Sequence, residues 1–311
     1  MEAKNENRGR KKITGLLVKM VGSVCLLLLI SNKLDFLLLF ESLKSADAMY
    51  LIFAVMGAFV FITIRVFKWY GFLCISQKGL KFSRVFSSYC FGLGVGILTP
   101  GRVGEITRIH NLELEQKAQA SGFFFLDKFI DLVVVFGMAL CGMCFLFPNQ
   151  INIFIFAGFV PGAILLLFSL RRIHYFFNSE KAGGLPFSDK FQKFFKAISR
   201  VPRPKIIFNA LLTLLSYIIC VYEEFFLLSA FAETKLIDVL FIHPIVMLTN
   251  AVPVTIGGLG LREGTSVFLY LQKGLAAEHA FLGGFLIFTF NTFFYGMLGI
   301  VSVNFTKLKR K

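Results

Sequence analysis

Two short segments of the chain combine proline, glycine, arginine and glutamate in the same order. One lies between residues 92 and 108, and the other between residues 250 and 264. Arginine carries a planar set of donors that matches a phosphate group, and a helix that begins after glycines presents free N–H groups to an anion. We expect these segments to recognise a phosphate-bearing group. Their candidate binding residues are Pro100, Arg102, Glu105, Arg108, Pro253, Gly257, Gly258, Gly260, Arg262 and Glu263.

Three further carboxylates, Asp127, Asp131 and Glu223, lie in apolar runs and join the candidate site. Asp127 and Asp131 are four residues apart and therefore share one face of a helix. They are placed to hold the arginines when no lipid is bound, or to carry a proton. The alternative interpretation is that these charges form buried ion pairs that only fix the fold.

The remaining chemical groups suggest no catalytic site. The four histidines are scattered without metal-ligand spacing, and the cysteines lie in or beside apolar runs, as small buried hydrophobes do. The chain contains neither a phosphate-binding loop for ATP nor a nucleophile elbow. We therefore expect no catalytic residue, no metal and no cofactor.

The elements that must position these residues are membrane-spanning helices. The chain is 56% hydrophobic and only 16% charged. Helices cross a bilayer in about 20 apolar residues, which predicts six full spans. They are 15–32, 48–68, 122–147, 151–170, 206–232 and 284–305. The net charge of +15 comes from basic residues between these runs, which favours contact with anionic headgroups over nucleic acid.

Lysine and arginine are concentrated in residues 1–14, 68–84, 171–205 and 307–311. The positive-inside rule therefore places these regions, and both termini, in the cytoplasm of a cell with the protein in its plasma (inner) membrane. Two apolar stretches, 85–121 and 236–283, must then begin and end on the same side. Because proline and glycine interrupt helices, we expect re-entrant hairpins that enter from opposite sides.

Each half of the chain thus reads as a span, a broken segment and a second span. This order predicts an inverted-topology repeat, whose paired interruptions point to the substrate site. The predicted fold is an all-α membrane protein with about six full spans plus two opposed re-entrant hairpins, in one domain over 15–306. Residues 187–201 alternate phenylalanine and lysine at helical spacing and predict an interfacial helix.

The three stretches Leu98–Glu105, Asp127–Asp131 and Pro253–Glu263 resemble the lysylphosphatidylglycerol synthase transmembrane family, also called flippase-like domain proteins. The resemblance covers roughly residues 13–306. This family includes the flippase half of the multiple peptide resistance factor, which moves aminoacylated phosphatidylglycerol between leaflets. The resemblance implies that Arg102, Glu105, Arg262 and Glu263 lie in or near a lipid pathway. The chain has no aminoacyl-transferase domain, so we expect it not to make the lysyl lipid itself.

The leading functional hypothesis is a flippase for a phospholipid or an isoprenoid-phosphate or glycolipid. Membrane lipids would be its binding partners, and a glycosyltransferase or lipid synthase would be its protein partner. A second hypothesis is a membrane enzyme, or its accessory subunit, that uses Glu105, Asp131 and Glu263 as acid or base. A third is a transporter of small anions, which the same arginines would suit.

Overall fold

The computed structural model describes residues 22–99, 101–148, 189–251 and 255–308, apart from the single positions 24, 27, 30, 33, 113, 116 and 256. The predicted span 151–170 and most of the predicted span 15–32 lie outside the described residues, as do the tail 1–14 and residues 309–311. Pro100 and Pro253 also lie outside them. Within the described ranges, all the regular secondary structure is helical, as the composition predicted.

Among the described residues, four helical stretches are long and apolar enough to cross a membrane. They are α3 (Ala48–Ser76), α5 (Lys117–Leu146), α8 (Arg203–Ser229) and Ala277–Val303, which combines α11 (Ala277–Phe288), the π-helix η4 (Thr289–Phe293) and most of α12 (Phe294–Leu308). Each exceeds the roughly 20 residues that a bilayer requires. Met56 and Phe59 on α3 are exposed, as expected of a face that contacts lipid. The four stretches correspond to four of the six predicted spans.

Two predicted boundaries were wrong. The α3 helix continues to Ser76, so Lys68 is not a loop residue but a helical one that is only 2% exposed. The last span begins at Ala277 rather than at 284. Gly283 and Gly284 do not break it, because they face Leu228 and Ser266 and allow close packing there. Glycine in an apolar helix often serves such close approach.

The two broken segments each contain a helix, an irregular turn and a shorter helix. The first has α4 (Phe82–Ile97) and the 3-10 helix η1 (Val103–Ile109), which packs back against α4. The second has α9 (Leu236–Leu248), the 3-10 turn η3 (Thr249–Ala251) and α10 (Leu261–Leu271). The turns contain residues with positive φ, namely Gly101, Arg102, Gly257, Gly258 and Gly260. Here glycine has the role that the sequence predicted.

Three other glycines do not bend the chain as predicted. Gly92, Gly94 and Gly96 all lie inside α4, which is continuous through them. A side chain at Gly92 would meet Arg108, and one at Gly96 would meet Glu105. Gly92 and Gly96 therefore let η1 lie directly against α4, while Gly94 faces Gly296 and Ile300 of α12.

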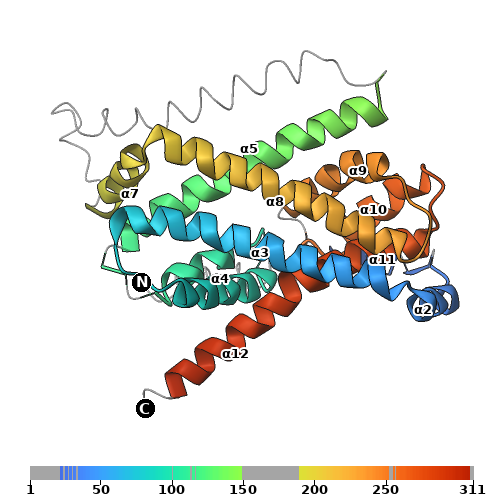
Figure 1. The fold of residues 1–311 in the computed structure, drawn as a ribbon, viewed down its shortest axis with the longest axis horizontal. Helices are drawn as coiled ribbons and strands as arrows, with labels where there is room; N and C mark the ends of the chain where they lie inside the picture. The colour runs from blue at the N-terminus through green and yellow to red at the C-terminus, as the bar shows by residue number, and fades with distance from the viewer. Residues whose placement is uncertain are drawn as a thin grey trace, which may run out of the picture.

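Helices of each half of the chain pack against helices of the other half. The α3 helix packs along α8, while α4 packs on α12 and α9 packs on α5 (Figure 1). The first helix of each broken segment thus lies against the final span of the other half. Two halves related by a two-fold axis would pack in this way, so the arrangement is compatible with the predicted repeat.

Two short helices flank this body. The α2 helix (Phe36–Ser45) lies near α11, and α7 (Asp189–Arg200) packs on α5 (Figure 1). The α7 helix falls within the predicted interfacial segment 187–201, and part of its apolar face is turned toward the protein, because Ala197 and Ile198 are buried. Gly122 on α5 permits this contact, since a side chain there would collide with the Phe194 backbone.

Candidate functional site

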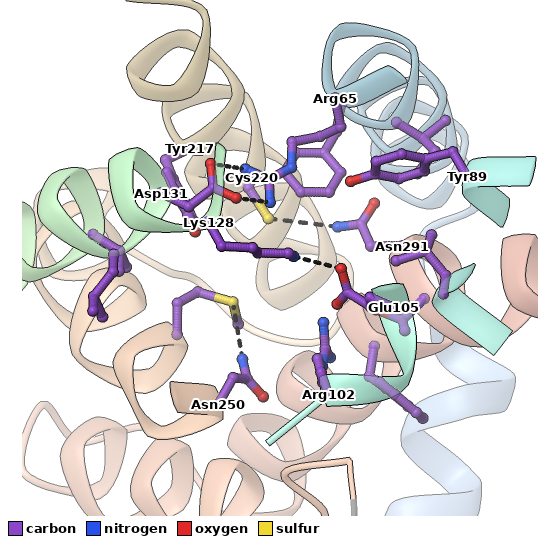
Figure 2. A pocket seen from close by; sticks show the side chains of 18 of the residues that line it. Arg65, Tyr89, Arg102, Glu105, Lys128, Asp131, Tyr217, Cys220, Asn250 and Asn291 are labelled. Carbon is purple, nitrogen blue, oxygen red and sulfur yellow. Dashed lines mark hydrogen bonds and ion pairs between the residues drawn. The ribbon is translucent and has the colours of Figure 1, made fainter. Parts of the chain in front are cut away.

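A cavity of about 430 Å³ lies where the two halves meet (Figure 2). Its wall combines residues of α3, α4, α5 and α8 with residues from both broken segments and the last span. The charged side chains that line it are Arg65, Arg102, Glu105, Lys128, Asp131 and Arg262. Four of the candidate residues from the sequence therefore reach one cavity.

Asp131 is held by two cations of α3. Arg65 donates to both of its carboxylate oxygens, at 2.8 and 2.6 Å, and Lys68 forms an ion pair with it. Lys68 also donates to the Thr213 hydroxyl at 2.7 Å. Arg65 and Lys68 are three residues apart and share one face of α3. This bidentate pairing fixes the Asp131 carboxylate at the cavity wall.

Asp127 was expected to hold an arginine, and it contacts Arg108 at 3.0 Å and Lys68 at 3.2 Å. The Arg108 guanidinium lies over the rings of Trp69 and Phe124, with 4.1 and 4.6 Å to the ring centroids. Such cation–π contacts stabilise a buried guanidinium. Arg108 and Asp127 do not line the cavity. They form a layer behind its wall.

The first broken segment contributes Arg102 and Glu105. Glu105 forms an ion pair with Lys128, so its carboxylate is partly neutralised. Arg102 has a left-handed backbone with φ of 55° and precedes the first turn of η1. Its Nε atom is buried, and its side chain has no hydrogen bond or ion pair within the described residues. Figure 2 shows the guanidinium directed toward Glu105 and the space below Lys128.

The second broken segment contributes Arg262 and its neighbour Glu263. Arg262 pairs with Glu263 and lies 4.5 Å from the centroid of the Phe288 ring. Glu263 also accepts a hydrogen bond of 2.7 Å from the Gly260 backbone N–H, which stabilises the start of α10. Arg262 lines the cavity, whereas Glu263 does not.

The tips of the two broken segments touch each other. A Cβ atom on Gly257 would lie 3.1 Å from the carbonyl oxygen of Ile97, at the end of α4. A Cβ atom on Gly258 would collide with the side chain of Asn250. Only glycine accommodates both this spacing and the positive φ of these positions.

The charges around the cavity do not balance. Six cationic side chains meet four anionic ones, an excess of two positive charges among the described residues, and Arg102 is the cation without an ion pair; the cations are Arg65, Lys68, Arg102, Arg108, Lys128 and Arg262, and the anions are Glu105, Asp127, Asp131 and Glu263. Buried charge without a partner is costly. An anionic ligand in the cavity would supply the missing partner.

The carboxylate of Glu223 is not at the cavity surface. It accepts a hydrogen bond of 2.7 Å from Asn291, and Asn291 and Cys220 line the cavity in its place. Its neighbour Glu224 faces away and pairs with His243. Glu223 is therefore connected to the cavity through its hydrogen bond with Asn291.

Sequence reasoning missed Arg65 and Lys68 and assigned no role to Lys128. A signal for the first two was present, because they lie three residues apart at the end of an apolar run. The predicted span ended at residue 68, so Lys68 was counted as a loop charge. Lys128 lies between Asp127 and Asp131, and its helical position alone did not predict a partner in η1.

The similarity of this chain to known families agrees with this architecture. A search of curated proteins found no match for the chain. The sequence model of the family described as lysylphosphatidylglycerol synthase TM region matches residues 15–299. The match includes both broken segments and every charged residue of the cavity. The chain is therefore a multi-pass membrane protein that belongs to the lysylphosphatidylglycerol synthase transmembrane-region family.

Proposed function

We propose that the protein is a translocase that moves a lipid with a phosphate-bearing headgroup across the bilayer. The observation that carries this proposal is the unpaired positive charge of the cavity, with Arg102 free to bind. A phosphate monoester or diester accepts several hydrogen bonds and pairs well with guanidinium groups. Membership of a family of lipid-related membrane domains supports the same class of ligand.

The rim of the cavity supports a lipid over a soluble anion. Val103, Ile106 and Leu132 line the cavity and are also 69%, 37% and 43% exposed on the surface. Exposed apolar side chains at this position match lipid tails, while the charged wall matches a headgroup. A lipid would keep its tails in the bilayer as its headgroup enters between η1 and α5.

The ion pairs of the cavity supply a means of binding and release. A phosphate would bind Arg102 directly, and would compete with Glu105 for Lys128 and with Glu263 for Arg262. Each exchange keeps the cation paired, while the released Glu105 stays close to Arg102 and Arg108 and the released Glu263 keeps the Gly260 N–H. Because Arg102 and Arg262 belong to different broken segments, alternate movement of these segments would hand the headgroup from one to the other.

The test is leaflet exchange in proteoliposomes that contain a trace of fluorescent phosphatidylglycerol, measured by chemical quenching of the outer leaflet. The wild-type protein should accelerate exchange over protein-free liposomes. Arg102→Gln should slow it by about tenfold, since a charge-assisted contact to phosphate contributes about 1.5–3 kcal/mol. Lys78→Gln removes the same charge from an exposed loop and should change nothing. Absence of exchange with folded wild-type protein and several anionic headgroups would refute the proposal.

A transporter of small anions would use the same cavity, and a separate experiment tests this alternative. Uptake of radiolabelled phosphate and glycerol phosphate into the same liposomes would be measured. Uptake without lipid exchange would replace the translocase by an anion transporter. No observation favours an enzyme, because Glu105 and Asp131 are both engaged in ion pairs with lysine or arginine.

A further inference from the structure

A second group of polar residues lies outside the lipid cavity, among α8, α9 and α10. It contains Glu223 and Glu224 of α8, His243 of α9 and Tyr270 of α10, and all four side chains are almost fully buried. None of them lines the cavity. The translocation scheme above uses none of these groups, so their burial needs another explanation.

Two of these side chains are incompletely satisfied. Glu224 contacts Nδ1 of His243 and interacts with the Tyr270 hydroxyl. Nε2 of His243 and one oxygen of Glu223 have no partner within the described residues. Buried polar atoms usually have partners, so these two unsatisfied atoms indicate that the cluster binds a further group.

The charges of this cluster identify that ligand. Glu224 pairs with the imidazole of His243, the adjacent Glu223 faces Asn291 instead, and within the described residues no lysine or arginine forms an ion pair with either carboxyl group. Glu223 has only the neutral amide of Asn291 as a partner. An isolated carboxylate in such surroundings is very costly. The described His, Cys, Asp and Glu residues include no group of three with metal-binding geometry. A proton needs no such set of ligands, and carboxyl and imidazole groups both bind it.

Among the described residues, the elements packed against the cluster offer few other titratable groups. Those that face the cluster are Cys220 of α8, Tyr295 of α12 and Asp238 of α9, which acts on Tyr270 from the end of its helix. The α3 and α11 helices present Gly57 to Glu223 and Gly283 to Leu228, and α5 presents Gly142 to Phe241. The protonation state of the cluster therefore depends mainly on the interactions among its own side chains.

The cluster connects the surface with the lipid cavity. On one side, Asp238 and Lys273 form a partly exposed ion pair of 3.4 Å, and Asp238 precedes His243 by five residues, or about 7.5 Å along α9. On the other side, Glu223 accepts from Asn291, which lines the cavity. Asp238 acts electrostatically on Tyr270, so the cluster has a titratable group near the surface on one side and a hydrogen bond to the cavity wall on the other.

We propose that Glu223, Glu224 and His243 form a proton-binding site that is coupled through Asn291 to the headgroup in the cavity. The coupling rests on the proposed lipid translocation, whereas the proton site itself does not. The negative charge of a phosphate beside Asn291 favours the protonated cluster. Proton binding and lipid binding therefore promote each other, as linkage requires. A proton gradient then drives the lipid in the direction of proton flow.

The first experiment detects the proton directly. Infrared difference spectra would be recorded for the full chain in phosphatidylcholine nanodiscs as the pH is changed. A band from a protonated buried carboxyl group should appear and should be lost in Glu223→Gln or Glu224→Gln. Glu278→Gln is the matched control, because Glu278 is also buried but bonds to the Asp35 backbone in another part of the protein. Spectra without such a band, or with a band unaffected by both cluster variants, would overturn the site.

The second experiment measures the coupling with fluorescent phosphatidylglycerol under an imposed pH gradient. The gradient should change the wild-type exchange rate by about fivefold or more, the lower end of common coupling factors. This dependence should vanish in Glu224→Gln and in His243→Gln, which serves if the first variant does not fold. Glu278→Gln should respond as wild type.

Different results would contradict the lipid translocase and its coupling to protons. Lipid exchange that ignores the gradient in both directions would overturn the coupling and leave the translocase in place. Conversely, no exchange of any anionic lipid would refute the translocase, while the carboxyl band would still decide whether the proton site exists.

Discussion

At the scale of single residues, Arg102 combines strain with an unsatisfied charge. A left-handed backbone costs a residue with a side chain roughly 1–2 kcal/mol, and such strain is often found at functional sites. The protein has arginine at this position although glycine would adopt the same backbone conformation without strain. We infer that the guanidinium is required at this position.

Arg102→Gly and Arg102→Ala separate these two properties. Both remove the guanidinium and should therefore lose lipid exchange equally. The glycine variant should nevertheless be more stable than the alanine variant by about 1 kcal/mol, because glycine adopts positive φ without strain. Thermal unfolding in detergent, followed by the fluorescence of Trp69, the single tryptophan, measures the difference. Equal stability would mean that the backbone at this position is not strained.

Asp131 and its partners are predicted to be strongly coupled. Asp131→Asn leaves Arg65 without its bidentate partner and should destabilise the protein by about 3 kcal/mol. Adding Arg65→Gln should cost less than the sum of the two single effects, since the unpaired charge is removed as well. Denaturant titration of the four proteins of this cycle gives the coupling energy, and additive effects would contradict a direct pair.

The residue types of the site were predictable from the sequence, but most of their partners were not. Helical spacing showed that Asp127 and Asp131 share a face, which is a local property. It did not show that this face meets Arg65 and Lys68 of α3, because the packing of distant helices is not encoded in spacing. The expected partner Arg102 lies elsewhere and is unpaired. Only the contact of Arg108 with Asp127 agrees with the expected pairing.

At the scale of elements, glycines serve two different purposes. Those at 257, 258 and 260 have positive φ and turn the chain, whereas those inside α4 and α12 let helices approach closely. A sequence marks a glycine but does not distinguish these purposes. For this reason the existence of the four apolar spans was predicted well, but two interruptions were misplaced. The first was predicted inside α4, before the helix ends, and the second was predicted to extend past the start of α11.

The contact of α4 with α12 is expected to depend on Gly299. A Cβ atom there would collide with the Cys90–Phe91 backbone, so Gly299→Ala should separate the helices and lower the melting temperature. Gly137 of α5 has nothing within 4 Å and is the matched control. Gly137→Ala should be neutral or stabilise by up to about 1 kcal/mol, because alanine favours helix. A melting temperature for Gly299→Ala equal to that of Gly137→Ala would contradict this contact.

At the scale of the whole molecule, the cavity belongs to neither half alone. Its cations come from α3, α5 and both broken segments, and the tips of these segments meet at Gly257 and Ile97. Relative movement of the halves would change which arginine faces a bound headgroup. In the present arrangement the excess positive charge is contributed by both halves. Selectivity for headgroup charge should therefore be a property of the entire bundle.

The excess positive charge of the cavity predicts which lipids the protein prefers. Phosphatidylglycerol carries one negative charge, whereas attachment of lysine adds two ammonium groups and makes the headgroup cationic. The excess of two positive charges should favour the first lipid over the second by about tenfold, which corresponds to about 1.4 kcal/mol. Competition by each unlabelled lipid against exchange of fluorescent phosphatidylglycerol measures the ratio. The double variant Arg102→Gln with Lys128→Gln removes both excess charges and should erase most of the preference, while Lys78→Gln should preserve it. A wild-type preference for the lysyl lipid would show that the excess charge does not set selectivity, because a cationic headgroup can be favoured only if other contacts outweigh the repulsion from Arg102 and Lys128.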